Sequence, residues 1–257
     1  MKMTSGRKFA VRLTAGALLA GMLMTAPAAG TRAYAADNGP VKTIQWKATL
    51  KQNIKVKVND KKIKLRKGKA VVVTVRRFSG RSGGNSSTVK IGGGTVKIPN
   101  RYLSYVSDLC TVTKTGDYTE DVKTDWVNEK NFSSKTKWLV WICLDKQRVN
   151  VFRRDSDGDW ELQRACRCST GKATTPTTPS FSDTIGFKKR WFKYYKNSGN
   201  LAYFMEFAGN GMHVWVGGNR GSLLGKHTAS HGCTRMTEED AIWMFERVPT
   251  RTKVIVW

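Results

Sequence analysis

Apolar and charged positions alternate with period two along the first part of the chain. Ile54, Val56 and Val58 are separated by Lys55 and Lys57, which is the pattern of a strand with one buried face. Gly, Asn and Ser clusters at residues 59–60, 79–87 and 92–94 supply turns. The pattern over residues 43–105 predicts four or five short strands, and we assign residues 36–105 to a small β module.

A second β pattern begins at Trp138. Residues 138–145, 148–153 and 160–168 predict three strands, and Asp157-Gly158 between the last two indicates a meander. Residues 237–247 predict the one persuasive helix, because Thr237 can cap it and Asp240 can complete a weak capping box. Residues 252–257 return as a strand. The polar residues 106–136, with isolated aromatics, indicate a connector, and the chain is predicted to be mostly β.

The end of the first module has a resemblance of its own. Residues 96–103, which read VKIPNRYL, resemble the close of a bacterial SH3-like wall domain. The small β module is therefore expected to be SH3-like in form.

The first 35 residues have the layout of a secretory signal peptide. Four basic residues precede an apolar run over residues 13–24, and small residues end at Ala33-Tyr34-Ala35. We expect cleavage after Ala35, with an uncleaved signal anchor as the lesser alternative. The run is short for a membrane span, and no later segment has the roughly 20 apolar residues that a span needs. The mature protein is expected outside the cytoplasm, at the cell wall, without a stable membrane span.

The charge indicates a polyanionic partner. The chain has 45 Lys and Arg against 19 Asp and Glu, a net charge of +26. Without residues 1–35, 40 basic residues remain against 19 acidic ones, a net charge of +21. Export argues against nucleic acid, so anionic cell-wall polymers are the expected partner, bound through the following lysines: Lys55, Lys57, Lys61, Lys62 and Lys64.

Five cysteines are an odd number for an exported protein. At least one of them should be a free or intermolecular thiol. We expect Cys233 to be free and some of the others, Cys110, Cys143, Cys166 and Cys168, to be bridged. Cys166 and Cys168 share one face of a strand, so they pair poorly with each other.

One segment carries the candidate chemistry. His213 is followed after sixteen residues by Ser230-His231-Gly232-Cys233 and then by Thr234-Arg235-Met236. This spacing resembles the signature of the YkuD-type L,D-transpeptidase family. The resemblance extends to residues 144–151, 168–172, 240–241 and 252–254, covers roughly residues 137–257, and includes nothing of the first 136 residues. Residues 175–181 keep the threonines and prolines of a family element but lack its glycine.

A cysteine used for acyl transfer must act as a thiolate, although the ordinary pKa of a thiol is about 8.5. A histidine within hydrogen-bond reach can act as its general base. The spacing does not choose between His213 and His231. His213 lies in an apolar strand, where packing and a backbone carbonyl bonded to its second ring nitrogen can hold it. The resemblance also favours His213 as the base and gives His231 a supporting role.

The remaining site residues are candidates for binding. Ser230 and Gly232, in the same turn, are candidates for oxyanion or substrate binding. Gly232 can turn tightly enough to direct the Cys233 N–H at the reacting carbonyl. Arg235 can pair with a substrate carboxylate or form an internal ion pair, and both interpretations stay open. A zinc site formed by His213, His227, His231 and Cys233 competes with the thiol chemistry, but the gaps do not follow the paired spacing of common zinc sites.

The resemblance implies a function without a metal or organic cofactor. It implies a β-sandwich-like catalytic domain over residues 137–257, in which Cys233 attacks a peptidoglycan stem peptide at its third residue and releases D-alanine. Transfer to an amine then gives a 3→3 cross-link. Hydrolysis of the same thioester by an L,D-carboxypeptidase is one alternative, and a non-catalytic wall-binding protein is another. We expect a monomer.

Overall fold

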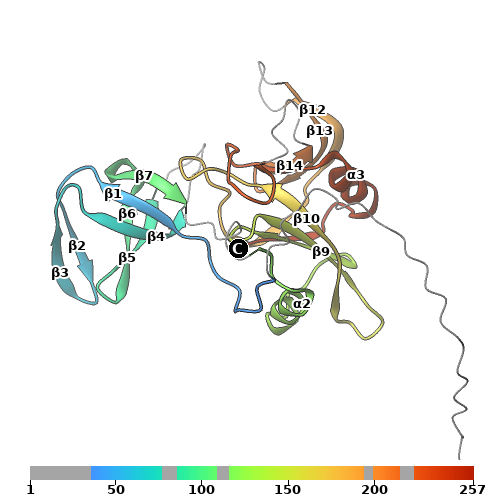
Figure 1. Cartoon of the computed structure of the whole chain (residues 1–257), viewed down its shortest axis with the longest axis horizontal. Coiled ribbons are helices and arrows are strands. Elements are labelled where there is room, and N and C mark those ends of the chain that lie inside the picture. Colours follow the sequence, from blue (N-terminus) through green and yellow to red (C-terminus); the bar gives the residue numbers. More distant parts are fainter. Residues whose placement is uncertain (1–35, 77–85, 109–115, 194–198, 215–222) are drawn as a thin grey trace, which may run out of the picture. The chain divides into compact units, whose positions relative to one another are not determined.

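The structure is a computed structural model that describes residues 36–76, 86–108, 116–193, 199–214 and 223–257. The expected signal peptide and Cys110 lie outside these ranges. Figure 1 shows a chain built mostly of strands, as the sequence predicts. In the described ranges, no helix combines the length and the apolar character that crossing a bilayer requires.

The N-terminal β module contains more strands than the four or five expected. Five of its strands form one sheet in the order β6-β5-β4-β1-β7, and β2 and β3 form a separate hairpin. The bounds are β1 Trp46–Leu50, β2 Ile54–Val58, β3 Lys61–Leu65, β4 Ala70–Arg76, β5 Ser86–Ile91, β6 Gly94–Pro99 and β7 Leu103–Asp108, with a 3-10 turn η1 at Asn100–Tyr102. The alternation of Lys and apolar residues corresponds to the exposed and the inner face of β2.

The second module is a nine-stranded mixed sheet in the order β11-β16-β8-β9-β10-β15-β14-β13-β12. The bounds are β8 Trp138–Cys143, β9 Arg148–Arg154, β10 Trp160–Ser169, β11 Ser180–Thr184, β12 Lys188–Lys193, β13 Asn200–Phe207, β14 Asn210–Val214, β15 Thr234–Met236 and β16 Lys253–Val256. The predicted meander is confirmed, because β8, β9 and β10 pair antiparallel in that order. The final strand, β16, pairs parallel with β8.

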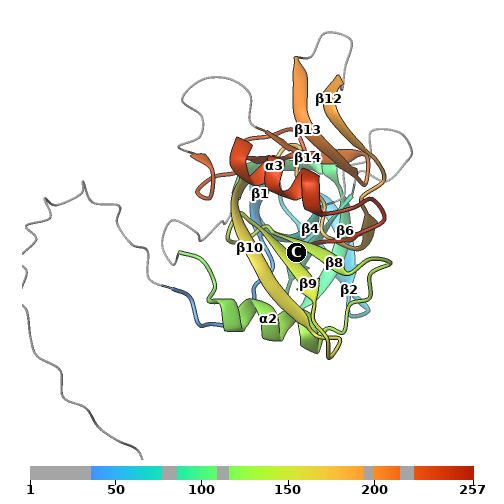
Figure 2. The same cartoon turned by 90° about the vertical axis from the view of Figure 1, so that its right-hand side faces the viewer.

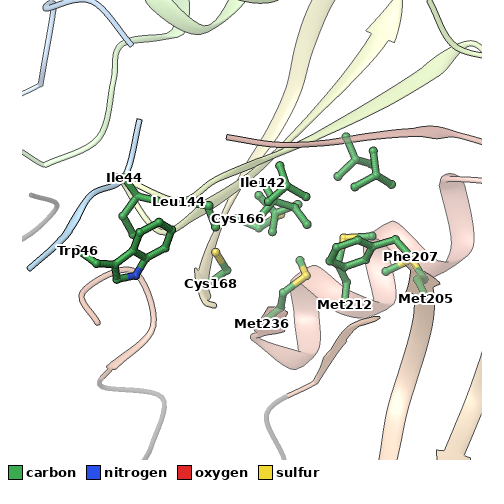
Figure 3. Packing of buried hydrophobic residues seen from close by; sticks show 14 of the residues in the cluster. Ile44, Trp46, Ile142, Leu144, Cys166, Cys168, Met205, Phe207, Met212 and Met236 are labelled. Atoms are coloured by element: carbon green, nitrogen blue, oxygen red, sulfur yellow. The ribbon is translucent and has the colours of Figure 1, made fainter. Parts of the chain in front are cut away.

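Strand β10 joins the two wings of this sheet, which are β11-β16-β8-β9 on one side and β15-β14-β13-β12 on the other. Its residues Trp160 to Arg167 pair with β9, whereas Cys168 and Ser169 pair with β15. The apolar residues of both wings then meet in one core, as expected for a sandwich-like domain. Figure 3 shows Ile142 and Cys166 in the same cluster as Met212 and Met236.

Two helices cover the described part of this sheet. The predicted helix is α3, Glu238–Arg247, where the Thr237 side chain accepts a hydrogen bond from the Asp240 N–H. Helix α2, Glu120–Glu129, was not predicted: it lies within the expected connector and is capped by Thr119. Helix α2 packs against β10, and α3 packs against β13 and β14 (Figure 2).

Candidate active site

The pairing of β14 with β15 brings the candidate nucleophile to the strand of the candidate base. The two strands are parallel, with His213 opposite Arg235. Cys233 precedes β15, and the backbone N–H of Gly211 on β14 hydrogen-bonds the Cys233 sulfur. The thiol therefore lies against β14 two residues before His213, although the two segments are separated by sixteen residues between His213 and Ser230.

His213 is buried and held in one tautomer. Its side chain is 5% exposed, and its Nδ1 lies 2.7 Å from the Val214 carbonyl oxygen. A carbonyl only accepts, so a neutral ring carries its proton on Nδ1 and leaves Nε2 as a proton acceptor. Burial lowers the pKa of His213 to about 4, and the charge of Arg235 acts in the same direction. The ring is thus neutral at pH 7, and the expected backbone carbonyl partner is confirmed.

Burial favours the protonated form of the Cys233 thiol, although acyl transfer requires the thiolate. Burial raises the pKa of Cys233, while the Gly211 N–H and the Arg235 charge oppose this shift without cancelling it. A raised thiol pKa together with a lowered imidazole pKa favours proton transfer during the reaction over a standing ion pair. Arg235 acts on the two groups in opposite senses, because its positive charge stabilises a thiolate but disfavours the imidazolium that forms when His213 takes the proton.

The turn that carries Cys233 is closed by side-chain hydrogen bonds. Ser230 Oγ accepts the Gly232 N–H at 3.1 Å and donates to the Cys233 carbonyl. Thr177 Oγ1 donates to the Gly232 carbonyl at 2.7 Å and accepts the Gly171 N–H at 2.9 Å. Ser230 is 1% exposed, so it shapes the turn from beneath. Gly232 has φ +124°, a conformation that requires glycine.

Asn210 and Gly211 of β14 contribute to the site, although neither belongs to the motif that the sequence analysis identified. A Cβ on Gly232 would approach Asn210 Oδ1 to 2.5 Å, and a Cβ on Gly211 would approach the Phe204 ring to 2.2 Å. Gly211 therefore lets its backbone reach the sulfur while Phe204 packs behind it. The sequence Asn210-Gly211 marks only a turn or a strand end, so the strand pairing is needed to assign these roles.

A buried amide supports the strand end that adjoins this turn. Gln147 donates from Nε2 to Thr170 Oγ1 at 2.8 Å and accepts the Thr170 N–H at the same distance. The Thr170 carbonyl in turn accepts the N–H groups of Ala229 and Ser230. The position of the nucleophile thus depends on polar groups from segments far apart in the sequence.

Thr177 offers a test of this support. Thr177→Val keeps the shape of the side chain but leaves the Gly171 N–H and the Gly232 carbonyl buried without their partner. We expect the free energy of unfolding to fall by about 2 to 6 kcal/mol, since each of the two unpaired buried groups costs roughly 1–3 kcal/mol. Urea unfolding measures the change. Thr177→Ser is the matched control and should lose about 1 kcal/mol; equal stability of all three proteins would contradict the assigned bonds.

The side chains of the other two histidines are exposed, and Arg235 is partly exposed. His231 lies in the turn itself and His227 in the preceding loop, and both side chains face solvent. Arg235 is half-buried and donates from Nη1 to the Ala229 carbonyl at 3.4 Å. In the described ranges, no three His, Cys, Asp or Glu side chains are grouped as metal ligands, so the alternative zinc arrangement is not assembled there.

The described cysteines differ in burial, and Cys110, which the expectation of bridges includes, lies outside the described ranges. Cys143 and Cys166 are buried free thiols, Cys168 is buried as well, and Cys233 is a half-buried free thiol. Cys143 packs in the apolar cluster beside α2, whereas Cys166 and Cys168 pack in the cluster between the two wings. The sheet therefore separates Cys143 from the other two, and burial raises the pKa of both Cys143 and Cys166. Cys233 remains the accessible thiol of this set.

The fold brings a half-buried cysteine to the strand of a neutral histidine, and thiol-dependent catalytic domains use a cysteine and a histidine in this way. Residues 137–256 match the family model described as the L,D-transpeptidase catalytic domain, YkuD. This part of the chain, 120 of its 257 residues, matches that family.

Solved structures with similarity to the chain include three from bacteria. A fused Zn-dependent amidase/peptidase/peptidoglycan-binding domain-containing protein from Clostridium acetobutylicum has 24% identity and a TM-score of 0.44, covering 54% of this chain and 59% of that one. An L,D-transpeptidase from Stackebrandtia nassauensis has 20% identity and a TM-score of 0.40, covering 56% and 69%. An L,D-transpeptidase from Mycobacterium smegmatis has 13% identity and a TM-score of 0.39, covering 88% and 96%.

These likenesses are distant, and the family assignment rests on the sequence match over residues 137–256. The chain spans less than two thirds of the Clostridium protein. No curated protein matches the chain.

Proposed function

We propose that this protein is a secreted peptidoglycan L,D-transpeptidase in which Cys233 is the nucleophile and His213 the general base. The observation that carries the proposal is the Nδ1 bond of His213 to the Val214 carbonyl, on the strand whose Gly211 N–H contacts the Cys233 sulfur. It leaves Nε2 as the proton acceptor on a rigid ring, on the same strand that contacts the thiol. The family assignment supplies the class of substrate.

In the first half-reaction, Cys233 attacks the carbonyl carbon of the third stem-peptide residue. His213 Nε2 takes the thiol proton as the S–C bond forms. When the C–N bond to D-alanine breaks, His213 returns the proton to the leaving amine. The products are a thioester on Cys233, free D-alanine and a neutral His213, so one base serves both proton transfers.

In the second half-reaction, the side-chain amine of another stem peptide attacks the thioester. His213 takes a proton from this amine as the N–C bond forms and delivers it to the departing sulfur, which restores the thiol. The peptide product is a 3→3 cross-link. If water replaces the amine, the same steps release a tripeptide, which is the carboxypeptidase reaction.

Backbone and cationic groups supply charge stabilisation in this proposal. The Cys233 N–H serves as an oxyanion donor, since the Gly232 N–H already donates to Ser230 Oγ. Arg235 stabilises the developing negative charge on sulfur and pairs with a carboxylate of the stem peptide. His231, exposed beside Cys233, contacts the bound substrate. The enzyme acts at the cell wall after removal of residues 1–35, as a monomer without a cofactor.

Incubation of the purified protein with disaccharide tetrapeptide, followed by mass spectrometry, tests the proposal. We expect cross-linked dimers with the loss of one D-alanine per bond formed, and no products with the Cys233→Ala protein as the blank. Tripeptide monomers as the sole product would assign the carboxypeptidase reaction instead. Unchanged tetrapeptide with a folded, reduced protein would favour the non-catalytic wall-binding alternative and refute both activities.

A further inference from the structure

The β2–β3 hairpin presents a dense array of cations with little compensation. Residues 51–69 contain nine Lys or Arg and a single acid, Asp60. All nine basic side chains are exposed. The ion pair formed within this continuous, fully described stretch joins Lys57 to Asp60, whose side chains are 63% and 94% exposed, and solvent weakens such a pair. Ordinary surfaces intersperse both signs of charge, so this face is unusual.

The strand register places lysines directly opposite one another. Lys55 faces Lys64, and Lys57 faces Lys62. Opposite residues of an antiparallel pair have Cβ atoms about 4.5–5.5 Å apart, and like charges there destabilise the hairpin. Successive pairs are spaced by two residues, about 6.8 Å along the strand. We call these four residues the lysine ladder. An array that weakens its own hairpin is relieved when a row of anions lies between the paired ammonium groups.

A hollow with mixed chemistry adjoins the ladder at Lys64. The hollow has a volume of about 620 Å³ and is lined by Ile63, Lys64, Leu65, Arg66, Lys67, Lys69, Ile91 and Gly92. Lys64 belongs to both features. The lining combines four cations with three aliphatic side chains, which suits a ligand with anionic groups joined by carbon segments. Figure 1 shows β2 and β3 as a separate hairpin beside β5 and β6.

We infer that the lysine ladder and its hollow bind a linear polyol phosphate polymer of the cell wall. Lys ammonium groups bind phosphates as point charges, and the aliphatic lining accommodates the carbon segments between phosphates. Single-stranded nucleic acid is disfavoured, because its binding proteins stack bases on aromatic side chains and the ladder and the lining contain none. The inference rests on the proposed action at the wall and assigns the N-terminal module the task of retaining the enzyme there.

The test measures binding of the full mature chain to a fluorescently labelled poly(glycerol phosphate) oligomer by anisotropy, over a series of salt concentrations. Replacing the whole lysine ladder by glutamine should weaken binding at least tenfold. The slope of log K against log salt should fall by about three, because each phosphate contact in a single strand contributes about 0.7. The matched control removes four exposed lysines elsewhere: Lys130→Gln, Lys135→Gln, Lys137→Gln and Lys193→Gln.

The control protein should bind within about threefold of wild type, because the attraction between exposed charges decays within about 8 Å at physiological salt. Equal weakening of both variants would assign binding to net charge and overturn the ladder. Single-stranded DNA of equal charge that binds as tightly as the polymer would overturn the polyol assignment. The double variants Lys55→Gln/Lys64→Gln and Lys57→Gln/Lys62→Gln, each expected to lose about threefold, test the ladder in smaller steps.

Two readouts separate this inference from the catalytic proposal. The ladder variant should retain wild-type turnover of soluble disaccharide tetrapeptide and should unfold at the wild-type temperature or above, since it removes like-charge pairs. The Cys233→Ala protein should bind the polymer as wild type does. If the wild type binds the polymer but does not turn over the tetrapeptide, the catalytic proposal is refuted and the inference about the lysine ladder and its hollow is retained.

Discussion

Replacing Cys233 by alanine should reduce turnover of disaccharide tetrapeptide at least about 10⁴-fold, the scale on which removal of a covalent nucleophile acts. Cys233 is the half-buried free thiol of the site, and the Gly211 N–H contacts its sulfur. Without the sulfur no thioester can form, so both half-reactions stop. Intact-protein mass spectrometry should detect an acyl adduct on wild type during turnover and none on the variant.

Cys143→Ala is the matched control for the loss of a thiol. Cys143 is buried in the cluster beside α2, apart from the candidate site, so its replacement should lower stability slightly and leave turnover within about twofold. An adduct that maps to another cysteine, or turnover by the Cys233→Ala protein, would remove Cys233 from the mechanism.

The sequence predicted the elements whose causes are local. Thr237 is the N-cap of α3 and Asp240 lies in its first turn, so the cap can be recognised from four consecutive residues. Strand alternation in β2 is equally local. Helix α2 was missed because its apolar residues, Val122, Trp126 and Val127, are few among ten mostly polar ones. Their burial against the outer face of the sheet decides the helix.

The site residues also divide into those that the sequence predicted and those that only the fold reveals. The spacing of His213 and Cys233 within one motif made both candidates, and the strand identity of His213 predicted its carbonyl partner. Thr177 lies 55 positions before Gly232, and Asn210 reaches the turn only because β14 pairs with β15. The pKa shift of the thiol could not be predicted from the sequence, because burial is a property of the fold and it raises the pKa of Cys233.

Replacing His213 by alanine should lower kcat/KM about 10³-fold, within the usual range for a general base. His213 is the buried ring whose Nδ1 lies on the Val214 carbonyl, and Nε2 is its proton acceptor. His231→Ala should cost about tenfold or less, because His231 is exposed and serves substrate contact in the proposal. His213→Gln, which keeps a polar side chain of similar length, guards against a loss caused by misfolding.

The pH dependence of kcat/KM distinguishes the two histidines more sharply than the loss itself. The base works only when neutral, and burial lowers the pKa of His213 to about 4. Wild-type activity should therefore rise with pH through about 4 and stay level across neutral pH. His213→Ala should lack this limb and gain activity steadily toward alkaline pH, as solvent deprotonates a thiol whose pKa burial raises. His231→Ala should keep the wild-type limb. If His231→Ala abolishes the limb and His213→Ala preserves it, the two roles are exchanged.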